Sequence, residues 1–222
     1  ADAAAQTQYG PLKEFVMSDD DRYELKIAGW LHDCGKVTTP EHVVEKSTKL
    51  ETIFDRIHMV NTRFEVLKRD AEIRVLKQKL DAHGKGKRVN EKRLDKALAA
   101  ELEQLERDRE FLNVCNIGSE SMAEADQERV ERIAAYRWVN NDGIEANFLT
   151  EEETYNLNIK KGTLTPEERE IINHHIVATI KLPETLPYPQ HLRHSPAFAG
   201  RHTEKMYGTG HPRGLTRAHN SG

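Results

Sequence analysis

Residues 50–71, LETIFDRIHMVNTRFEVLKRDA, decide the fold because their apolar positions recur at steps of three and four. This series consists of Leu50, Ile53, Ile57, Val60, Phe64, Leu67 and Ala71. The spacing predicts one long helix with a heptad-like seam. Residues 81–90, DAHGKGKRVN, interrupt the helix with two glycines, and a second apolar series follows at Leu94, Leu98, Leu102, Leu105 and Leu112. We therefore predict an antiparallel helical hairpin about 50 Å long.

The seam of this hairpin has two interpretations. Packing of the two helices against each other explains it most simply. The alternative is a surface for a protein partner or for self-association through residues 51–115, because extended amphipathic hairpins also present such surfaces.

Helical patterns continue through the rest of the chain, which predicts an all-α protein. Ser18 and Asp21 form a capping-box-like start for a helix whose apolar pattern runs on to Cys34. Residues 37–50 are predicted to be a loop, with Thr39 extended because Pro40 follows it. Residues 127–143 are predicted to form a shorter helix.

Two more helices are expected near the C-terminus. The first has Thr165 as its cap, Pro166 and Glu168 in its first turn, and Pro183 as the residue that ends or kinks it. The second has Ser195 as its cap.

The boundaries EKSTKLET (45–52) and KKGTLTPE (160–167) are similar to each other. We therefore expect residues 51–159 to be an inserted helical hairpin and connector, within a domain formed by residues 1–50 and 160–222.

The composition indicates a well-solvated protein, with 37% hydrophobic and 32% charged residues among 222. A net charge of −4 argues against a broad nucleic-acid surface. No apolar run approaches the roughly 20 residues of a membrane span, and the two cysteines make neither a CxxC pair nor a disulfide framework. A cytoplasmic location is expected. The N-terminal ADAAAQTQYG has no signal-peptide features and is interpreted as a cut end.

The stretch LHDCGK (31–36) carries candidate chemistry. On a helical wheel, one side holds Ile27, Trp30, Leu31 and Cys34, and the other holds Gly29, His32, Asp33 and Lys36. The side chains of His32 and Asp33 are expected to point in different directions and to bind either one metal ion between them or one ion each. Lys36 is expected to lie between these two directions. Gly29 is expected to let another helix approach. An imidazole and a carboxylate suit a divalent metal and an ammonium suits a phosphate, whereas a solvated polar face is the alternative.

Further candidate ligands come later in the chain. His175 lies within an apolar stripe of Ile171, Ile172 and Ile176, and His174 lies toward its edge. Such a histidine is either a satisfied core residue or, beside the first site, a ligand. His202 and Glu204 are expected on a third helix.

Three stretches together carry a family resemblance: GWLHDCGKVTTPEHVVEK (29–46), GTLTPEEREIINHHI (162–176) and HTEKMYGTGHPRGL (202–215). They resemble the successive motifs of the HD-GYP family, a branch of the HD metal-dependent phosphohydrolases, over residues 18–50 and 160–217. The resemblance implies an all-α bacterial signalling domain that binds divalent metals, often iron or manganese. It also implies hydrolysis of cyclic di-GMP by a metal-activated hydroxide.

The resemblance also implies residue roles. The metal ligands would be His32, Asp33, His175 and His202, and Glu204 would lie beside them. Asp33 and Lys36 would be catalytic, and the substrate contacts would be Lys36, Gly210, Pro212 and Arg213.

The last motif departs from the family pattern. Thr203, Tyr207 and His211 stand where the family has a histidine, an aspartate and the tyrosine of GYP. In addition, no His precedes His32 and no Asp follows Asp142. The remaining ligands suit one metal ion better than a two- or three-metal centre, so we expect weak or absent turnover. The competing hypothesis is a non-catalytic module that binds a ligand or partner and signals through the hairpin.

Overall fold

The computed structural model describes residues 2–86, 88, 90–200, 207 and 209. Within these residues the chain is helical apart from one small antiparallel sheet, which confirms the predicted all-α class. The chain divides into two compact units, which we call unit 1 (residues 1–44 and 166–222) and unit 2 (residues 45–165). Among the described helices, none has both the length and the apolar content needed to cross a membrane.

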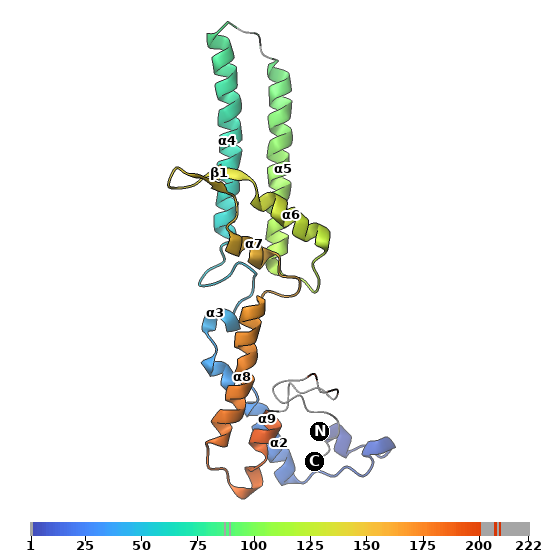
Figure 1. Cartoon of the computed structure of the whole chain (residues 1–222). Coiled ribbons are helices and arrows are strands. Elements are labelled where there is room, and N and C mark those ends of the chain that lie inside the picture. The colour runs from blue at the N-terminus through green and yellow to red at the C-terminus, as the bar shows by residue number, and fades with distance from the viewer. Residues whose placement is uncertain (1, 87, 89, 201–206, 208, 210–222) are drawn as a thin grey trace. The chain divides into compact units, whose positions relative to one another are not determined.

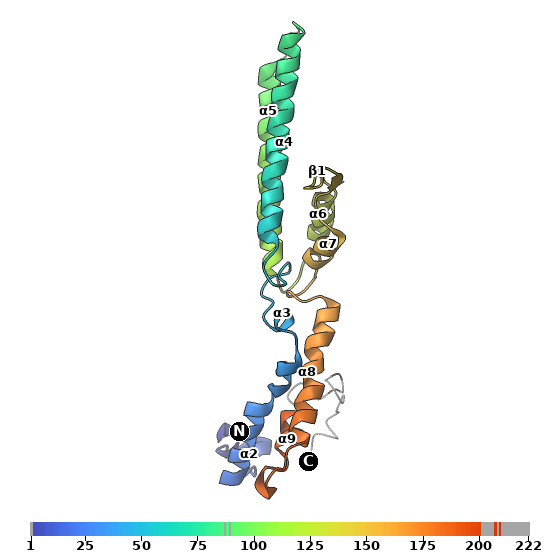
Figure 2. The same cartoon turned by 90° about the vertical axis from the view of Figure 1, so that its left-hand side faces the viewer.

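Unit 2 is built on the predicted hairpin of two long helices, which lie side by side in Figures 1 and 2. These helices are α4 (Ile57–Gly84) and α5 (Glu91–Ile117). Asn90 caps α5, because its side-chain oxygen accepts a hydrogen bond from the backbone N–H of Arg93. Buried members of both apolar series form the seam: Val60, Phe64, Ala71, Leu105 and Leu112.

The start of α4 was predicted wrongly. The helix begins at Ile57, so Leu50 and Ile53 precede it, and Ile53 is 95% exposed. Asp55 sets this start, because its Oδ1 accepts a hydrogen bond of 2.9 Å from the backbone N–H of Ile57. Leu50 is still fully buried, but from a loop in which its N–H donates to Asn116 Oδ1 at 2.8 Å.

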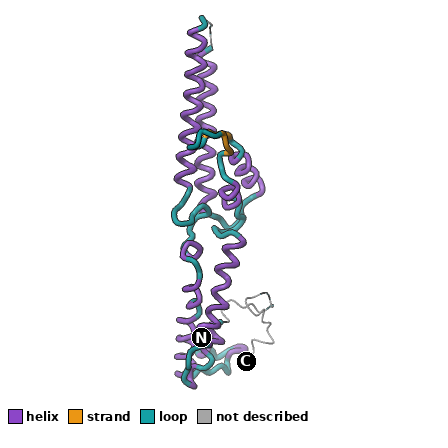
Figure 3. The backbone as a smooth tube through the Cα atoms, turned by 60° about the vertical axis from the view of Figure 1, so that its left-hand side comes forward, coloured by secondary structure: helices purple, strands orange, loops and turns teal. Residues whose placement is uncertain are grey.

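The predicted helix over residues 127–143 was also wrong in its C-terminal half. Helix α6 (Glu124–Ala134) is followed by strands β1 (Arg137–Val139) and β2 (Glu145–Asn147), drawn in orange in Figure 3, and by helix α7 (Glu151–Leu157). The strands pair antiparallel, with Trp138 opposite Ala146. Asn140 organises the turn because its Oδ1 accepts the N–H groups of Asp142 and Ile144, and Gly143 supplies a φ of 75°.

A buried polar cluster holds α6 and the strands to α5. Asp108 is only 2% exposed, and its carboxylate accepts hydrogen bonds from Tyr136 Oη at 2.6 Å and Arg129 Nη2 at 2.9 Å. Burial and the bond to Asp108 raise the pKa of Tyr136 to about 12. The Arg129 guanidinium also lies over the ring of Phe111, 4.1 Å from its centroid.

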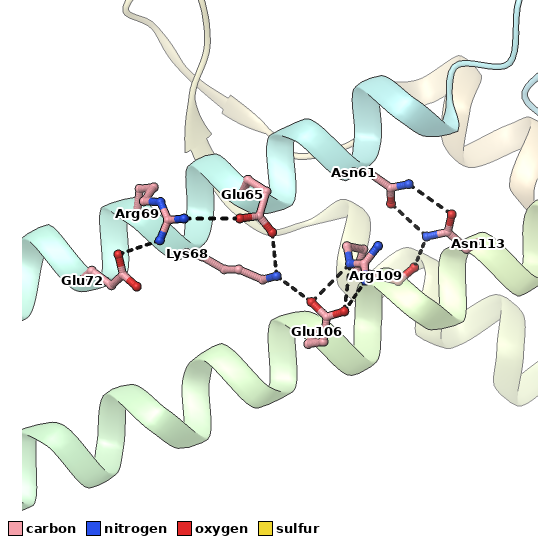
Figure 4. A network of polar contacts seen from close by, with 8 residues as sticks. All are labelled: Asn61, Glu65, Lys68, Arg69, Glu72, Glu106, Arg109 and Asn113. Carbon is pink, nitrogen blue, oxygen red and sulfur yellow. Dashed lines mark hydrogen bonds and ion pairs between the residues drawn. The ribbon is translucent and has the colours of Figure 1, made fainter.

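Polar contacts also join α4 to α5, as Figure 4 shows. The ammonium of Lys68 on α4 donates to Glu65 on the same helix and to Glu106 on α5. Arg109 also donates to Glu106, and these bonds from Arg109 and Lys68 lower the pKa of Glu106 to about 2.

Unit 1 consists of short helices around one longer helix. Its elements are α1 (Asp2–Ala5), the 3₁₀ turn η1 (Gly10–Leu12), α2 (Asp19–Leu31), the 3₁₀ turn η2 (Cys34–Thr38), α3 (Glu41–Val44), α8 (Pro166–Glu184), the 3₁₀ turn η3 (Gln190–Leu192) and α9 (Ser195–Ala199). The capping box of Ser18 and Asp21 at the start of α2 is confirmed.

Four predictions for unit 1 need correction. Helix α2 ends at Leu31 instead of running through Cys34, and Trp30, expected on an apolar face, is 69% exposed. The expected loop after residue 37 contains α3, although Thr39 before Pro40 is extended as predicted, with a ψ of 134°. In α9, His194 and not Ser195 occupies the N-cap position.

Candidate functional site

The candidate site lies where η2 packs against α8, two segments that are far apart in the sequence. The N–H of Gly35 donates to Thr179 Oγ1 at 3.0 Å, and the Thr38 hydroxyl donates to the carbonyl of Gly35 at 2.8 Å. A Cβ on Gly35 would lie 2.0 Å from the backbone oxygen of His175. Only glycine therefore allows this approach of the two segments.

The prediction that Gly29 allows this close approach was wrong. A Cβ added to Gly29 would meet nothing within 4 Å. The reason is that the chain leaves the helix after Leu31, so the glycine that packs against α8 is Gly35 on η2.

Three cationic or potentially cationic side chains surround the carboxylate of Asp33. Its Oδ2 lies 2.8 Å from Lys36 Nζ and 3.3 Å from His32 Nε2. Its Oδ1 lies 3.5 Å from His175 Nε2. Hence His32 and Asp33 do not diverge as the helical wheel predicted. Together with Lys36 and His175 they converge, because residues 33–36 have left the α-helix.

The charges in this cluster favour an ionised Asp33. Partial burial raises the pKa of its carboxyl, but the hydrogen bond and charge of Lys36 and the nearby His32 and His175 outweigh that effect. The pKa of Asp33 therefore lies below its usual value. An ionised carboxylate is the state required both for metal coordination and for an ion pair with Lys36.

Both imidazoles of the cluster are oriented by backbone carbonyl groups. His32 Nδ1 lies 2.6 Å from the oxygen of Gly29, and His175 Nδ1 contacts the oxygen of Ile172. Because a carbonyl oxygen only accepts hydrogen bonds, each Nδ1 carries the proton. The Nε2 atoms are thereby directed toward Asp33, in the orientation that metal-binding histidines commonly take.

The donor types therefore suit a divalent cation, but the described side chains do not complete a site for one. Across the described part of the chain, no group of three or more His, Cys, Asp or Glu side chains is arranged to hold a metal ion. The cluster consists instead of two imidazoles and the Lys36 ammonium around one carboxylate.

The remaining predicted site residues have different outcomes. His175 is buried with 7% exposure, whereas the adjacent His174 is exposed. His202, Glu204, Gly210, Pro212 and Arg213 lie outside the described residues. Tyr207, at a position where the last motif departs from the family, is 89% exposed.

Besides Gly35, sequence reasoning missed a second residue that builds the site. Thr179 is fully buried, and its hydroxyl accepts the N–H of Gly35. The sequence did indicate this position, because Thr179 follows His175 by one helical turn and therefore lies on the same face of α8.

Comparison with known proteins concerns the α8 side of this site. A family model described as HD domain matches residues 151–219, a range that includes α8 and begins after the His32–Asp33 pair. No curated protein and no solved structure gives a significant match to the chain. Residues 151–219 are therefore similar to HD domains, which are typically metal-dependent phosphohydrolases.

Proposed function

We propose that this chain is an HD domain of the HD-GYP type, which binds a divalent metal ion and cyclic di-GMP and hydrolyses the dinucleotide weakly or not at all. The observation that carries the proposal is the convergence of His32, Lys36 and His175 on Asp33. The HD-domain match supports it independently.

The proposed metal ligands are His32, Asp33 and His175, together with His202. Imidazole and carboxylate ligands suit iron or manganese, and we propose one ion because the sequence offers few further ligands. When bound, such an ion activates water for attack on phosphorus. The residues of this chain supply the ligands and hold them in orientation.

The proposed phosphate contact is Lys36. Its side chain is 40% exposed, so the ammonium can turn from Asp33 toward a phosphoryl oxygen of a bound dinucleotide. Gly210, Pro212 and Arg213 are proposed as further substrate contacts on the basis of the motif resemblance. A metal ion on Asp33 would release Lys36 for this contact, because both cations compete for the same carboxylate.

Weak turnover is proposed because of the substitutions in the last motif. Thr203 offers a hydroxyl in place of an imidazole, and Tyr207 offers a phenol in place of a carboxylate. Both replacements remove strong ligands for a second or third ion.

Metal binding tests the proposal directly. We would titrate the full chain with Mn²⁺ and, without oxygen, with Fe²⁺, and measure stoichiometry by calorimetry and elemental analysis. His175→Gln should lower affinity at least tenfold, whereas His174→Gln should leave it unchanged because His174 is exposed on the same helix. Equal effects of the two substitutions, or no binding by the unmodified chain, would refute the metal site.

Nucleotide binding and turnover are measured separately. Lys36→Met should weaken cyclic di-GMP binding without lowering Mn²⁺ affinity, because Lys36 contacts the phosphate and competes with the metal ion for Asp33. Chromatography of the reaction should show little pGpG from the unmodified chain. Turnover at ordinary enzyme rates would contradict the reduced activity, and metal binding without nucleotide binding would contradict the substrate class.

The second candidate function is a non-catalytic signalling module that acts through its helical hairpin. It is favoured by three large apolar side chains exposed on α4, namely Ile73, Leu76 and Leu80. A chain that binds neither metal nor nucleotide but retains its helicity would support this candidate.

A further inference from the structure

Helix α4 carries a second line of apolar side chains, on the side away from α5. Ile73, Leu76 and Leu80 are 46%, 56% and 72% exposed. The hairpin seam uses Ala71 and Val75, which are 2% and 6% exposed. Because each residue turns the helix by about 100°, Ile73 lies almost opposite Ala71. The exposed line is therefore left over after the hairpin has packed.

The spacing of this line is that of a helix-packing surface. Val66, Ile73 and Leu80 recur every seven residues, and Leu76 follows Ile73 by three. Positions separated in this way are the a and d positions of a heptad repeat, which form the contact line when two helices coil around each other. Isolated exposed apolar residues are ordinary on protein surfaces, but a heptad-spaced line on one helix indicates a partner helix.

The charges beside the line indicate which partner helix fits. Asp70 and Lys77 flank it on one side, and Glu72 and Lys79 flank it on the other. If a second α4 lies antiparallel, with the two-fold axis between Ile73 and Leu76, Asp70 meets Lys77 of the second copy. Glu72 and Lys79 are already paired within the hairpin, with Arg69 and with Asp95 on α5. By symmetry the attraction between Asp70 and Lys77 occurs twice.

Other arrangements of the same helix fit less well. In a parallel pair in the same heptad register, Glu72 would meet Lys77 of the second copy, but Glu65 would meet Asp70, and the repulsion between these like charges would offset the attraction. In the antiparallel pair, Arg69 faces Leu80, where its aliphatic stem can cover the leucine while the guanidinium remains in water.

We propose that this chain self-associates through antiparallel packing of the α4 helices across Ile73, Leu76 and Leu80. The proposal concerns unit 2 and does not depend on the chemistry proposed for unit 1. The contact line from residue 66 to residue 80 is only about 20 Å long. Because so short an interface buries little surface, we expect a dissociation constant in the micromolar range.

Analytical ultracentrifugation of the full chain tests the proposal, over concentrations from about 1 to about 200 μM. We expect a monomer–dimer equilibrium, and Leu76→Asp should abolish the dimer. Val114→Asp on α5 is the matched control, because Val114 is 69% exposed but lies outside the line. It should leave the equilibrium unchanged. A monomer throughout this range, or equal effects of the two substitutions, would overturn self-association.

Charge reversal tests the antiparallel arrangement. Asp70→Lys and Lys77→Glu should each weaken the dimer about tenfold, because each places like charges across the two-fold axis. In the double variant, the lysine at position 70 of one copy again faces an acidic residue at position 77 of the other, so the original affinity should be restored. Circular dichroism confirms that each variant remains helical. A double variant that is as weak as the single variants would overturn the antiparallel pairing.

Discussion

The substitution Gly35→Ala perturbs the packing that assembles the candidate site. The added Cβ would lie 2.0 Å from the oxygen of His175, 2.4 Å from the nitrogen of Thr179 and 2.6 Å from its hydroxyl oxygen. Two of these three atoms belong to the backbone of α8, so rotation of a side chain cannot relieve the overlap. To restore a separation of 3.0 Å from the His175 oxygen, η2 and α8 must move apart by at least 1 Å.

The expected cost follows from this displacement. Overpacking of a buried contact costs about 1–3 kcal/mol. Separation of the segments also stretches the bond from Gly35 N–H to Thr179 Oγ1, which contributes about 0.5–1.5 kcal/mol. Together they lower the free energy of unfolding of unit 1 by about 2–4 kcal/mol. The same movement carries His175 away from Asp33, so Mn²⁺ affinity should fall with stability.

The matched control is Gly29→Ala, three residues before His32. Nothing lies within 4 Å of a Cβ at this position, and the residue is inside α2. Alanine should therefore stabilise the helix by about 0.5–1 kcal/mol through its higher helix propensity. The two substitutions add the same methyl group at positions six residues apart, on α2 and on η2, and their effects on stability are expected to have opposite signs.

Hydrogen exchange measured by mass spectrometry resolves the two units. In the Gly35→Ala variant, peptides from α8 should lose protection corresponding to about 2–4 kcal/mol, while peptides from α4 should not change. If α8 lost less than about 0.5 kcal/mol of protection, or if Gly29→Ala were equally destabilising, the close docking of η2 on α8 would be refuted.

Three further predictions concern unit 2. Asp108→Ala should destabilise it by about 3–5 kcal/mol in urea unfolding, because Arg129 and Tyr136 lose a buried carboxylate; a loss below about 1 kcal/mol would contradict the cluster. The pKa of Glu106 is about 2 in the folded chain against 4.5 ordinarily, so its contribution is present above pH 4.5 and is lost as the pH falls toward 2. Because Glu106 is partly exposed, this contribution should be below about 1 kcal/mol, and Glu106→Gln should flatten that part of the stability profile. Gly143→Val should cost about 1–2 kcal/mol in thermal unfolding because Gly143 has a φ of 75°, and an unchanged midpoint would contradict the turn.

The hairpin could be predicted from the sequence because amphipathic periodicity is a local property. Its start could not, because the apolar steps continue smoothly through Ile53 into Ile57. A side chain sets the start of the helix. Asp55 accepts a hydrogen bond from the backbone N–H of Ile57 and another from the side-chain amide of Asn116 on α5. The second of these contacts joins positions far apart in the chain, so periodicity does not reveal it.

The strands illustrate a different limit. The residues before Gly143 fit a helical pattern, and only pairing of Trp138 with Ala146 makes them a strand. The signal available was Asn140 followed by an Asp–Gly pair, which is typical of hairpin turns. That turn chemistry outweighs the weak apolar periodicity around it.

For the candidate site, the sequence predicted the residue types but not their geometry, and the helix end explains why. On a continued helix, the side chains of His32 and Asp33 would diverge by about 100°. In the structure Asp33 leaves the helix, with φ −115° and ψ 8°, a sparsely populated backbone conformation between helix and strand. The following 3₁₀ turn brings Lys36 back onto the Asp33 carboxylate and places Gly35 against α8. The glycine is therefore as necessary to the arrangement as the ligands are, because any side chain there would separate Asp33 from His175.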